Sequence, residues 1–203
     1  MILQGSPEWF QAKLGKVGAS RISDVLAKGK GVTRGNYLAE LVSERLTGRI
    51  YEDGYENAYM LRGKEMEDEA RNAYEFITGN VVQLVGFVDH PTIPMSGASP
   101  DRLVNDDGLL EIKCRKTALH LEYLLTNTIK YDESVQMQWQ LACTGRKWCD
   151  FVSYDPRMPP ELQLFIKRVV RDDARIHSLE EEVRAFLAEV DVTVRKLQAL
   201  RVV

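Results

Sequence analysis

The chain has 203 residues, of which 44% are hydrophobic and 28% charged, so it is long enough for one compact domain and too apolar to be disordered. No stretch approaches the ~20 apolar residues of a membrane span, and the first residues lack the basic region and apolar run of a signal peptide. The net charge of −3 argues against a uniformly basic nucleic-acid-binding protein, but leaves room for local basic clusters around Arg34 and from Lys113 to Lys116.

These features predict a single domain over residues 1–203 in the cytoplasm, with no membrane partner. Three cysteines, Cys114, Cys143 and Cys149, form no CxxC pair. We therefore expect free thiols in a reducing compartment and no zinc site.

Short helical patterns and turns alternate from Ser6 to about Gly48. Ser6 and Pro7 suit the start of a first helix, and Ser20 to Leu26 begins a second. Residues 29–36 are rich in glycine and basic residues and are predicted to form a loop. Lys28, directly before it, adds to the basic cluster that Lys30 begins. The N-terminal third is thus expected to be helical.

The strongest helical pattern runs from Glu56 to Thr78, where apolar residues recur every three or four positions and Gly79 follows. Beyond it the pattern changes to strands. We predict strands at Val81–Val88, Leu103–Val104, Leu109–Cys114, Trp148–Tyr154 and Gln163–Val170, with helices at Glu133–Thr144 and from Asp172 to about Arg201. The fold class is therefore mixed α/β.

The segment Gly108–Cys114 carries the first candidate chemistry. Side chains alternate along a strand, so Glu111 and Lys113 share one face. A solvated ion pair is the ordinary interpretation of such a pair on its own.

A second acid returns to the same place. Asp101 follows Pro100, and a hairpin through residues 105–108 brings it near Glu111. Mg²⁺ is held by one or two carboxylates together with water and phosphate, and a lysine can orient the nucleophile or offset phosphate charge. A regular four-residue turn would place Arg102 opposite Glu111, so the site requires a bulge, a bend near Pro100 or a different loop length.

Five ordered blocks, EWFQAKLGKVGASRISDV, GKEMEDEARNAYEFITG, SGASPDRLVNDDGLLEIKC, QMQWQLACTGRKW and FVSYDPRM, resemble the viral recombinase family of PD-(D/E)xK nucleases, the lambda-exonuclease type. The similarity extends to about Asp191. A bare P-D…E-x-K is a weak pattern, whereas five blocks in order are specific.

The resemblance implies a restriction-endonuclease-like core, with a central mixed sheet flanked by helices. It further implies Mg²⁺-dependent digestion of one strand of linear duplex DNA from a free 5′ end, with Mn²⁺ as a substitute and one or two ions bound. The 3′ single strand left behind would serve recombination. A homotrimeric ring, a single-strand annealing partner, and a phage or prophage origin in a bacterial host are also implied.

The same resemblance implies roles for individual residues. Asp101, Glu111 and the backbone carbonyl of Ile112 are expected to hold the metal, and Lys113 to activate water or neutralise phosphate. Glu67, on the edge of its helix's apolar stripe, corresponds to a helix-borne carboxylate beside the metal, reached directly or through water. Gln136 corresponds to a glutamine near the active site, whereas Gln138 and Gln140 are interpreted as structural or surface residues.

A 5′-end enzyme must also hold a terminal phosphate. Lys13, Ser20 and Ser99 match pocket positions of the family, although the family's arginine is a lysine at Lys13. A second pocket arginine corresponds to Leu119 here, and Arg115, Lys116 or His120 are candidates to replace it. Met60 matches a residue that wedges the duplex end apart, with core packing as the alternative interpretation.

Two other functions stay open. One is a structure-specific or sequence-specific endonuclease of the same fold, because specificity depends on the surrounding loops. The other is a non-catalytic DNA-binding subunit, for which loss of a site residue would be expected. All four principal residues, Glu67, Asp101, Glu111 and Lys113, are present.

Overall fold

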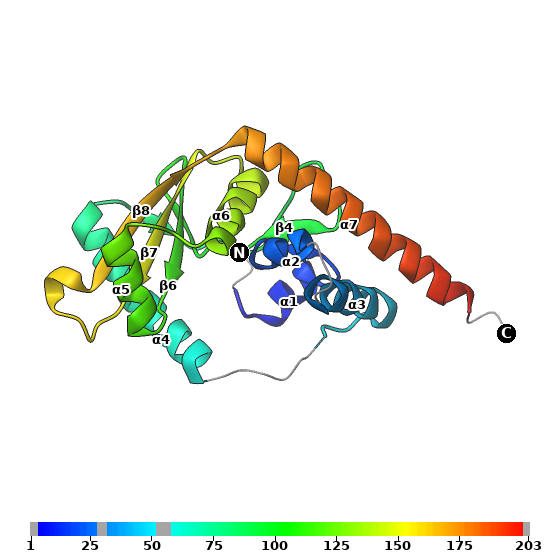
Figure 1. Cartoon of the computed structure of the whole chain (residues 1–203), viewed down its shortest axis with the longest axis horizontal. Coiled ribbons are helices and arrows are strands. Elements are labelled where there is room, and N and C mark those ends of the chain that lie inside the picture. The colour runs from blue at the N-terminus through cyan, green and yellow to red at the C-terminus, as the bar shows by residue number, and fades with distance from the viewer. Residues whose placement is uncertain (1–3, 28–31, 52–57, 201–203) are drawn as a thin grey trace.

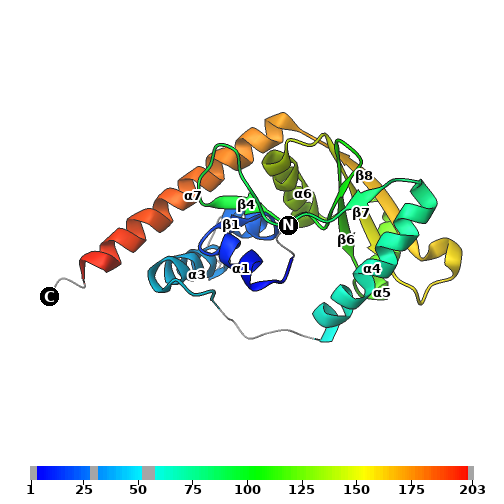
Figure 2. The same cartoon turned by 180° about the vertical axis from the view of Figure 1, so that it is seen from behind.

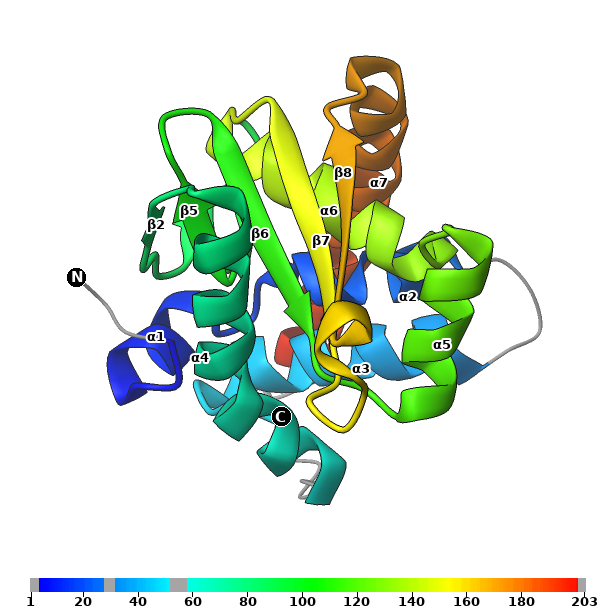
Figure 3. The ribbon, with the colours of Figure 1, turned by 90° about the vertical axis from the view of Figure 1, so that its left-hand side faces the viewer.

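A computed structural model describes residues 4–27, 32–51 and 58–200, with backbone alone from 58 to 65. Its centre is a five-stranded mixed sheet in the order β2-β5-β6-β7-β8 (Figures 1 and 3). The strands are β2 (Val82–Gln83), β5 (Arg102–Val104), β6 (Gly108–Lys113), β7 (Trp148–Tyr154) and β8 (Leu164–Val170). Only the β6–β7 pair within this sheet is parallel, which confirms the mixed α/β class.

Helices cover both faces of this sheet. On one face, α4 (Ala58–Thr78) packs against an apolar layer that includes Leu110 and Ile112 (Figure 2). On the other, α5 (Thr117–Thr126) and α6 (Tyr131–Thr144) cover Leu109 and Phe151. The alternation predicted for β6 is therefore present, and it directs Glu111 and Lys113 toward α6.

A second layer joins the sheet to the N-terminal helices. It contains α1 (Pro7–Lys13), the 3₁₀ turn η1 (Ala19–Arg21), α2 (Ile22–Leu26) and α3 (Val32–Thr47), with a small sheet ordered β1 (Val17–Gly18), β4 (Ser96–Ala98), β3 (Val88–Asp89). The 27-residue helix α7 (Asp173–Ala199) runs from the end of β8 across these helices (Figure 1). A short turn η2 (Pro160–Leu162) connects β7 and β8.

Local sequence explains several boundaries. The Ser6 hydroxyl accepts the backbone N–H of Trp9 at 3.2 Å, as expected of the cap of α1. The Asp172 carboxylate accepts the N–H of Arg175 at 3.0 Å and starts α7. Gly145, with a φ of +69°, ends α6.

Three expectations differ from the structure. The predicted loop at 29–36 is helical from Val32 onward, while Lys28, Gly29 and Lys30 lie outside the described residues. The predicted strand Val81–Val88 is reduced to β2 and β3, and α5 was not predicted. The loop prediction failed because tertiary packing outweighs the cost of Gly35 in α3. Tyr37 and Leu41 on that helix are both 2% exposed.

The three cysteines are free thiols, as predicted. Burial raises the pKa of Cys114 to about 12, and it also raises the pKa values of Cys143 and Cys149. Within the described ranges, no helix combines the length and apolar character needed to cross a bilayer.

We expect a buried histidine, His90, to make the fold sensitive to acid. The Nδ1 atom of His90 accepts the N–H groups of Thr92 and Ile93 at 3.3 and 3.2 Å, and its Nε2 lies 3.3 Å from Oε1 of Glu180. Burial lowers the pKa of His90, an effect that Glu180 opposes and Arg184 reinforces. Because the unfolded chain then takes up the proton first, stability will fall as the pH drops below about 6.5.

We therefore expect the urea midpoint of the wild type to fall between pH 8 and pH 5.5 by more than that of His90→Gln. The exposed residue His177 on α7 supplies the control, and His177→Gln should retain the wild-type pH response. Equal pH responses in all three proteins would show that His90 does not cause the acid sensitivity.

Candidate active site

The β5–β6 hairpin brings the two predicted acids together. Its register pairs Arg102 with Leu110 and Val104 with Gly108, leaving a three-residue turn. The four-residue turn assumed from the sequence is therefore wrong by one position. With the shorter turn, Asp101 comes opposite Glu111, and no bulge is needed.

The turn is held from outside the hairpin. Asn105 adopts a left-handed φ of +45°, a conformation that asparagine tolerates better than most residues. The guanidinium of Arg146, just after α6, donates to the carbonyls of Val104, Asn105 and Gly108 at 3.1, 3.0 and 2.7 Å. A Cβ on Gly108 would lie 2.2 Å from the ring of Trp148, so only glycine fits there without a shift of the tryptophan.

The Asp101 side chain forms a hydrogen bond with the neighbouring strand, β6. Its Oδ2 accepts the backbone N–H of Ile112 at 2.6 Å. Burial raises the pKa of Asp101 well above its ordinary value, and the negative charge of Glu111 raises it further, while Lys113 opposes both effects. The two carboxylates are thus close enough to repel each other.

Glu111 is the most enclosed acid of the group, at 1% exposure. Its Oε1 accepts from the Lys113 ammonium and from Nε2 of Gln136, the latter at 2.7 Å. Its Oε2 accepts from Nε2 of Gln140 at 2.6 Å. Two glutamines one turn apart on α6 therefore hold the carboxylate from above β6.

The Lys113 ammonium contacts Glu111 and is close enough to Asp101 to be affected by its charge. Burial lowers the pKa of its ammonium, but the charges of Glu111 and Asp101 raise it by more, so the net shift is upward. The positively charged Lys113 ammonium is therefore held in place by the two carboxylates.

Glu67 reaches this group through Arg102. The guanidinium of Arg102, at 7% exposure, donates to Oε1 of Glu67 at 2.8 Å and to the backbone carbonyl of Asp101 at 2.6 Å. It also contacts Oδ1 of Asp68 at 3.3 Å. Arg102 thus ties α4 to the strand that carries Asp101, and Glu67 contributes to the raised pKa of Asp101.

The donor set suits a hard divalent cation. Asp101 and Glu111 repel each other in a poorly solvated position, and a bound cation would remove that repulsion. Among the residues that the structure describes, no three acidic, histidine or cysteine side chains converge as a ready-made metal cage. That arrangement is compatible with Mg²⁺, which uses one or two carboxylates and retains water and phosphate.

Three predicted phosphate-site residues lie in the N-terminal layer, and two of them, Lys13 and Ser99, contact the same residue, Trp9. The indole Nε1 of Trp9 donates to Oγ of Ser99 at 2.8 Å, and the Lys13 ammonium lies 4.4 Å from the centre of the Trp9 ring. Ser20 follows β1 and Ser99 follows β4, and these paired strands are parallel, so both residues lie at the same end of the pair. Burial lowers the pKa of Lys13, while Glu44 and Glu40 raise it.

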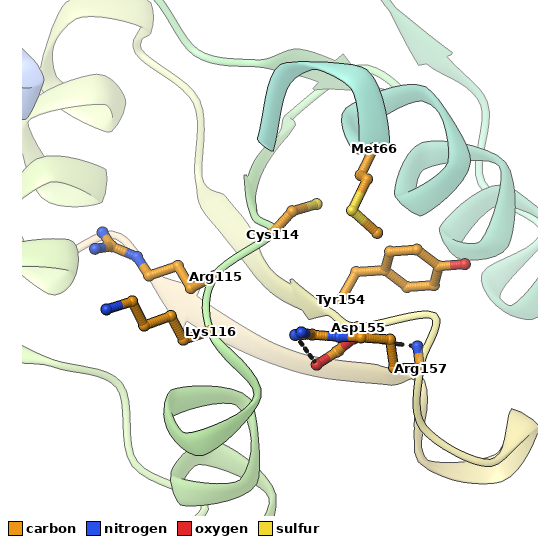
Figure 4. Close-up of a pocket in the computed structure, with 7 residues that line it drawn as sticks. All are labelled: Met66, Cys114, Arg115, Lys116, Tyr154, Asp155 and Arg157. Carbon is orange, nitrogen blue, oxygen red and sulfur yellow. Dashed lines mark hydrogen bonds and ion pairs between the residues drawn. The ribbon is translucent and has the colours of Figure 1, made fainter. Parts of the chain in front are cut away.

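Arg115 and Lys116 lie elsewhere, beyond the end of β6. They line a cavity of about 130 Å³ whose lining includes none of Lys13, Ser20 and Ser99. In Figure 4 their side chains extend to one side of the chain, while the Cys114 side chain extends to the other, toward Met66. The remaining lining residues are Tyr154, Asp155 and Arg157, and the pair of hydrogen bonds from Arg157 holds the pKa of Asp155 well below its usual range.

One further candidate, His120, is not available for phosphate. Leu119, where the family's second arginine is missing, packs against the core from α5. His120 is fully buried, with Nδ1 2.8 Å from Oγ of Ser153 and Nε2 2.8 Å from the carbonyl of Leu162. The side chain of Met60 lies outside the described part of the chain.

The sequence interpretation missed two residues of the site. Gln140 was placed among structural or surface positions, yet it is 0% exposed and contacts Glu111. Its spacing of four from Gln136 on a helix was the available signal. Arg102 had no such signal, because its role depends on how α4 crosses the sheet.

Comparisons with known proteins agree with this architecture. Residues 8–147 match the YqaJ-like viral recombinase domain. The crystal structure of an alkaline exonuclease (LHK-Exo) from Laribacter hongkongensis is 50% identical, with a TM-score of 0.91 and coverage of 97% of this chain and 98% of that one. The structure of LHK-Exo in complex with dAMP is also 50% identical, with a TM-score of 0.92 and coverage of 98% and 100%.

A phage related exonuclease from Haemophilus somnus 129PT shares the fold at 15% identity, with a TM-score of 0.69 and coverage of 90% and 96%. Among curated proteins no match was found. The family resemblance and the mixed α/β fold are thus confirmed, and the chain belongs to the YqaJ-like viral recombinase family and is an exodeoxyribonuclease.

Proposed function

We propose that this enzyme is a Mg²⁺-dependent 5′-to-3′ exonuclease that digests one strand of linear duplex DNA and leaves a 3′ single strand for recombination. The observation that carries the proposal is the pairing of Asp101 with Glu111 across the hairpin, with the Lys113 ammonium in contact with Glu111. The 50% identical alkaline exonuclease supports the same class of reaction.

In this proposal Asp101, Glu111 and the carbonyl of Ile112 hold the cation, with Glu67 nearby through Arg102. A bound Mg²⁺ would lower the pKa of water and offset charge on the scissile phosphate, and Mn²⁺ would substitute. Lys113 orients the attacking water or neutralises the phosphate, and Gln136 holds Glu111 in place.

We assign the terminal 5′ phosphate to the group formed by Lys13, Ser20 and Ser99. A lysine ammonium and serine hydroxyls are the kinds of donor that a phosphate requires. The Trp9 indole holds the Ser99 hydroxyl and packs beneath the Lys13 ammonium. Arg115 and Lys116 would contact the DNA backbone farther along, since they line a different cavity.

Digestion of matched DNA substrates tests the proposal. With Mg²⁺, linear duplex bearing a 5′ phosphate should yield mononucleotides and a single strand, and the same duplex with a 5′ hydroxyl should react more slowly. Covalently closed circles should persist, and EDTA should stop the reaction. Cleavage of the circle would instead favour an endonuclease of the same fold.

The family resemblance is also the basis for proposing a homotrimeric ring around the DNA, a single-strand annealing protein as partner, and action in the cytoplasm of a bacterial host. Sedimentation velocity at several protein concentrations tests the ring. A monomer at all concentrations would contradict it.

A further inference from the structure

The acceptor positions of Glu111 are almost fully used by the protein. A carboxylate offers about four lone-pair positions. Lys113 and Gln136 donate to Oε1, and Gln140 donates to Oε2. Three of those positions are therefore taken, which leaves Oε2 as the oxygen with room for one further partner.

The orientation of the Gln140 amide follows from its neighbour. A carboxylate can only accept, so the amide must turn its NH₂ group toward Glu111. Its Oε1 is consequently left buried, and it has no hydrogen-bond partner among the described residues. A buried acceptor without a partner is unfavourable. The hydrogen bonds of the Gln140 amide to the protein therefore do not by themselves explain why a glutamine lies at this position.

Gln138, two residues earlier on the same helix, provides the contrast. It is also buried, at 3% exposure. Its Nε2 donates to the carbonyl of Val170 at 2.8 Å, and its Oε1 accepts the N–H of Asp172 at 3.0 Å. Both ends of the Gln138 amide thus stabilise the junction of β8 and α7, in accord with a structural role.

We infer that Gln140 is a positioning residue that determines how Glu111 meets the metal, an inference that rests on the proposed metal-dependent function. Lys113 and Gln136 fill Oε1, so Glu111 can offer the cation a single bond through Oε2, and Gln140 fixes the direction of that bond by occupying one side of Oε2. Mg²⁺ suits that arrangement, whereas Ca²⁺ is larger, takes more ligands and commonly accepts both oxygens of a carboxylate. By fixing the direction of the one bond, Gln140 favours Mg²⁺, which demands near-ideal octahedral geometry, over Ca²⁺, whose coordination is flexible.

The test compares Gln140→Met with Gln138→Met, both near-isosteric replacements on one helix. Metal affinity is measured without DNA, from the rise in Tm on titration with Mg²⁺ or Ca²⁺ and from bound Mn²⁺ by electron paramagnetic resonance. Gln140→Met should weaken Mg²⁺ binding about tenfold to a hundredfold and lower the ratio of Mg²⁺ to Ca²⁺ affinity. Gln138→Met should lower the Tm and leave both affinities at the wild-type value.

Should Gln140→Met fail to fold, Gln140→Asn serves instead, because it keeps the amide and shortens its reach by one methylene. Wild-type affinities in the Gln140 variant, or equal losses in the Gln140 and Gln138 variants, would overturn the inference while the wild type still binds Mg²⁺. Absence of Mg²⁺ binding by the wild type would overturn the proposed function itself.

Discussion

Asp101→Asn will abolish digestion of linear duplex DNA and raise the thermal stability of the metal-free protein. Asparagine can still accept the N–H of Ile112, so the hairpin is retained. What is removed is a carboxylate whose pKa is raised by burial and by Glu111. A folded-state pKa above the unfolded value costs stability as pH rises from the unfolded pKa to the folded one, and above both the cost is complete.

The activity should fall at least about a thousandfold, since a metal ligand contributes several kcal/mol to the transition state. The Tm in EDTA should rise by a few degrees, at about 2–4 °C per kcal/mol in a chain of this size. Saturating Mg²⁺ should stabilise the wild type and leave Asp101→Asn unchanged. Asp106→Asn removes the same charge from the exposed turn and should behave as the wild type.

Retention of activity by Asp101→Asn would remove this residue from the active site. A lower Tm in EDTA would indicate instead that the carboxylate supports the hairpin. The combination of lost activity and higher stability is therefore specific to a functional carboxylate, because most substitutions of buried structural residues destabilise.

Lys113→Met will reduce the rate of digestion about a hundredfold to a thousandfold, the usual loss for removal of one transition-state donor. Methionine keeps the apolar stem of the lysine and removes only the ammonium, which contacts Glu111. Apparent DNA affinity should change little, because a single charge among many phosphate contacts is lost. Single-turnover kinetics with excess enzyme separates the chemical step from binding.

Lys147→Met is the matched control at the other end of the β6–β7 pair. Lys147 forms a 2.7 Å ion pair with Asp107, and its side chain is 75% exposed, so its loss should cost little. If Lys147→Met and Lys113→Met slowed the reaction equally, general electrostatic attraction for DNA would explain both results.

β6, which carries both Glu111 and Lys113, and its neighbour β7 were predictable because they are long strands for this chain, with six and seven residues. β7 begins and ends where the sequence predicts, at Trp148 and Tyr154. β1 and β4 contain only two and three residues, too few to show a period of two. β1 and β4 pair although they lie far apart in the chain, and a local sequence pattern cannot predict such a pairing.

The hairpin register shows the same limit at the active site. Asn105 to Gly108 reads as a four-residue turn, and the sequence left the position of Asp101 open for that reason. The three-residue turn is held by Arg146, which lies just beyond the end of α6. Likewise, helical spacing alone shows that Gln140 shares a face of α6 with Gln136. Its contact with Glu111 could not be predicted, because that contact depends on how α6 crosses β6.

The grip of Arg146 on backbone carbonyls has a consequence for how this hairpin tolerates change over evolutionary time. Because these three hydrogen bonds go to backbone carbonyls, they do not depend on the exposed side chain of Asp106, which can change without moving Asp101. An insertion of one residue is a different matter, since it turns every side chain of one strand to the opposite face. The turn is therefore permissive toward substitution of Asp106 and intolerant of changes in length.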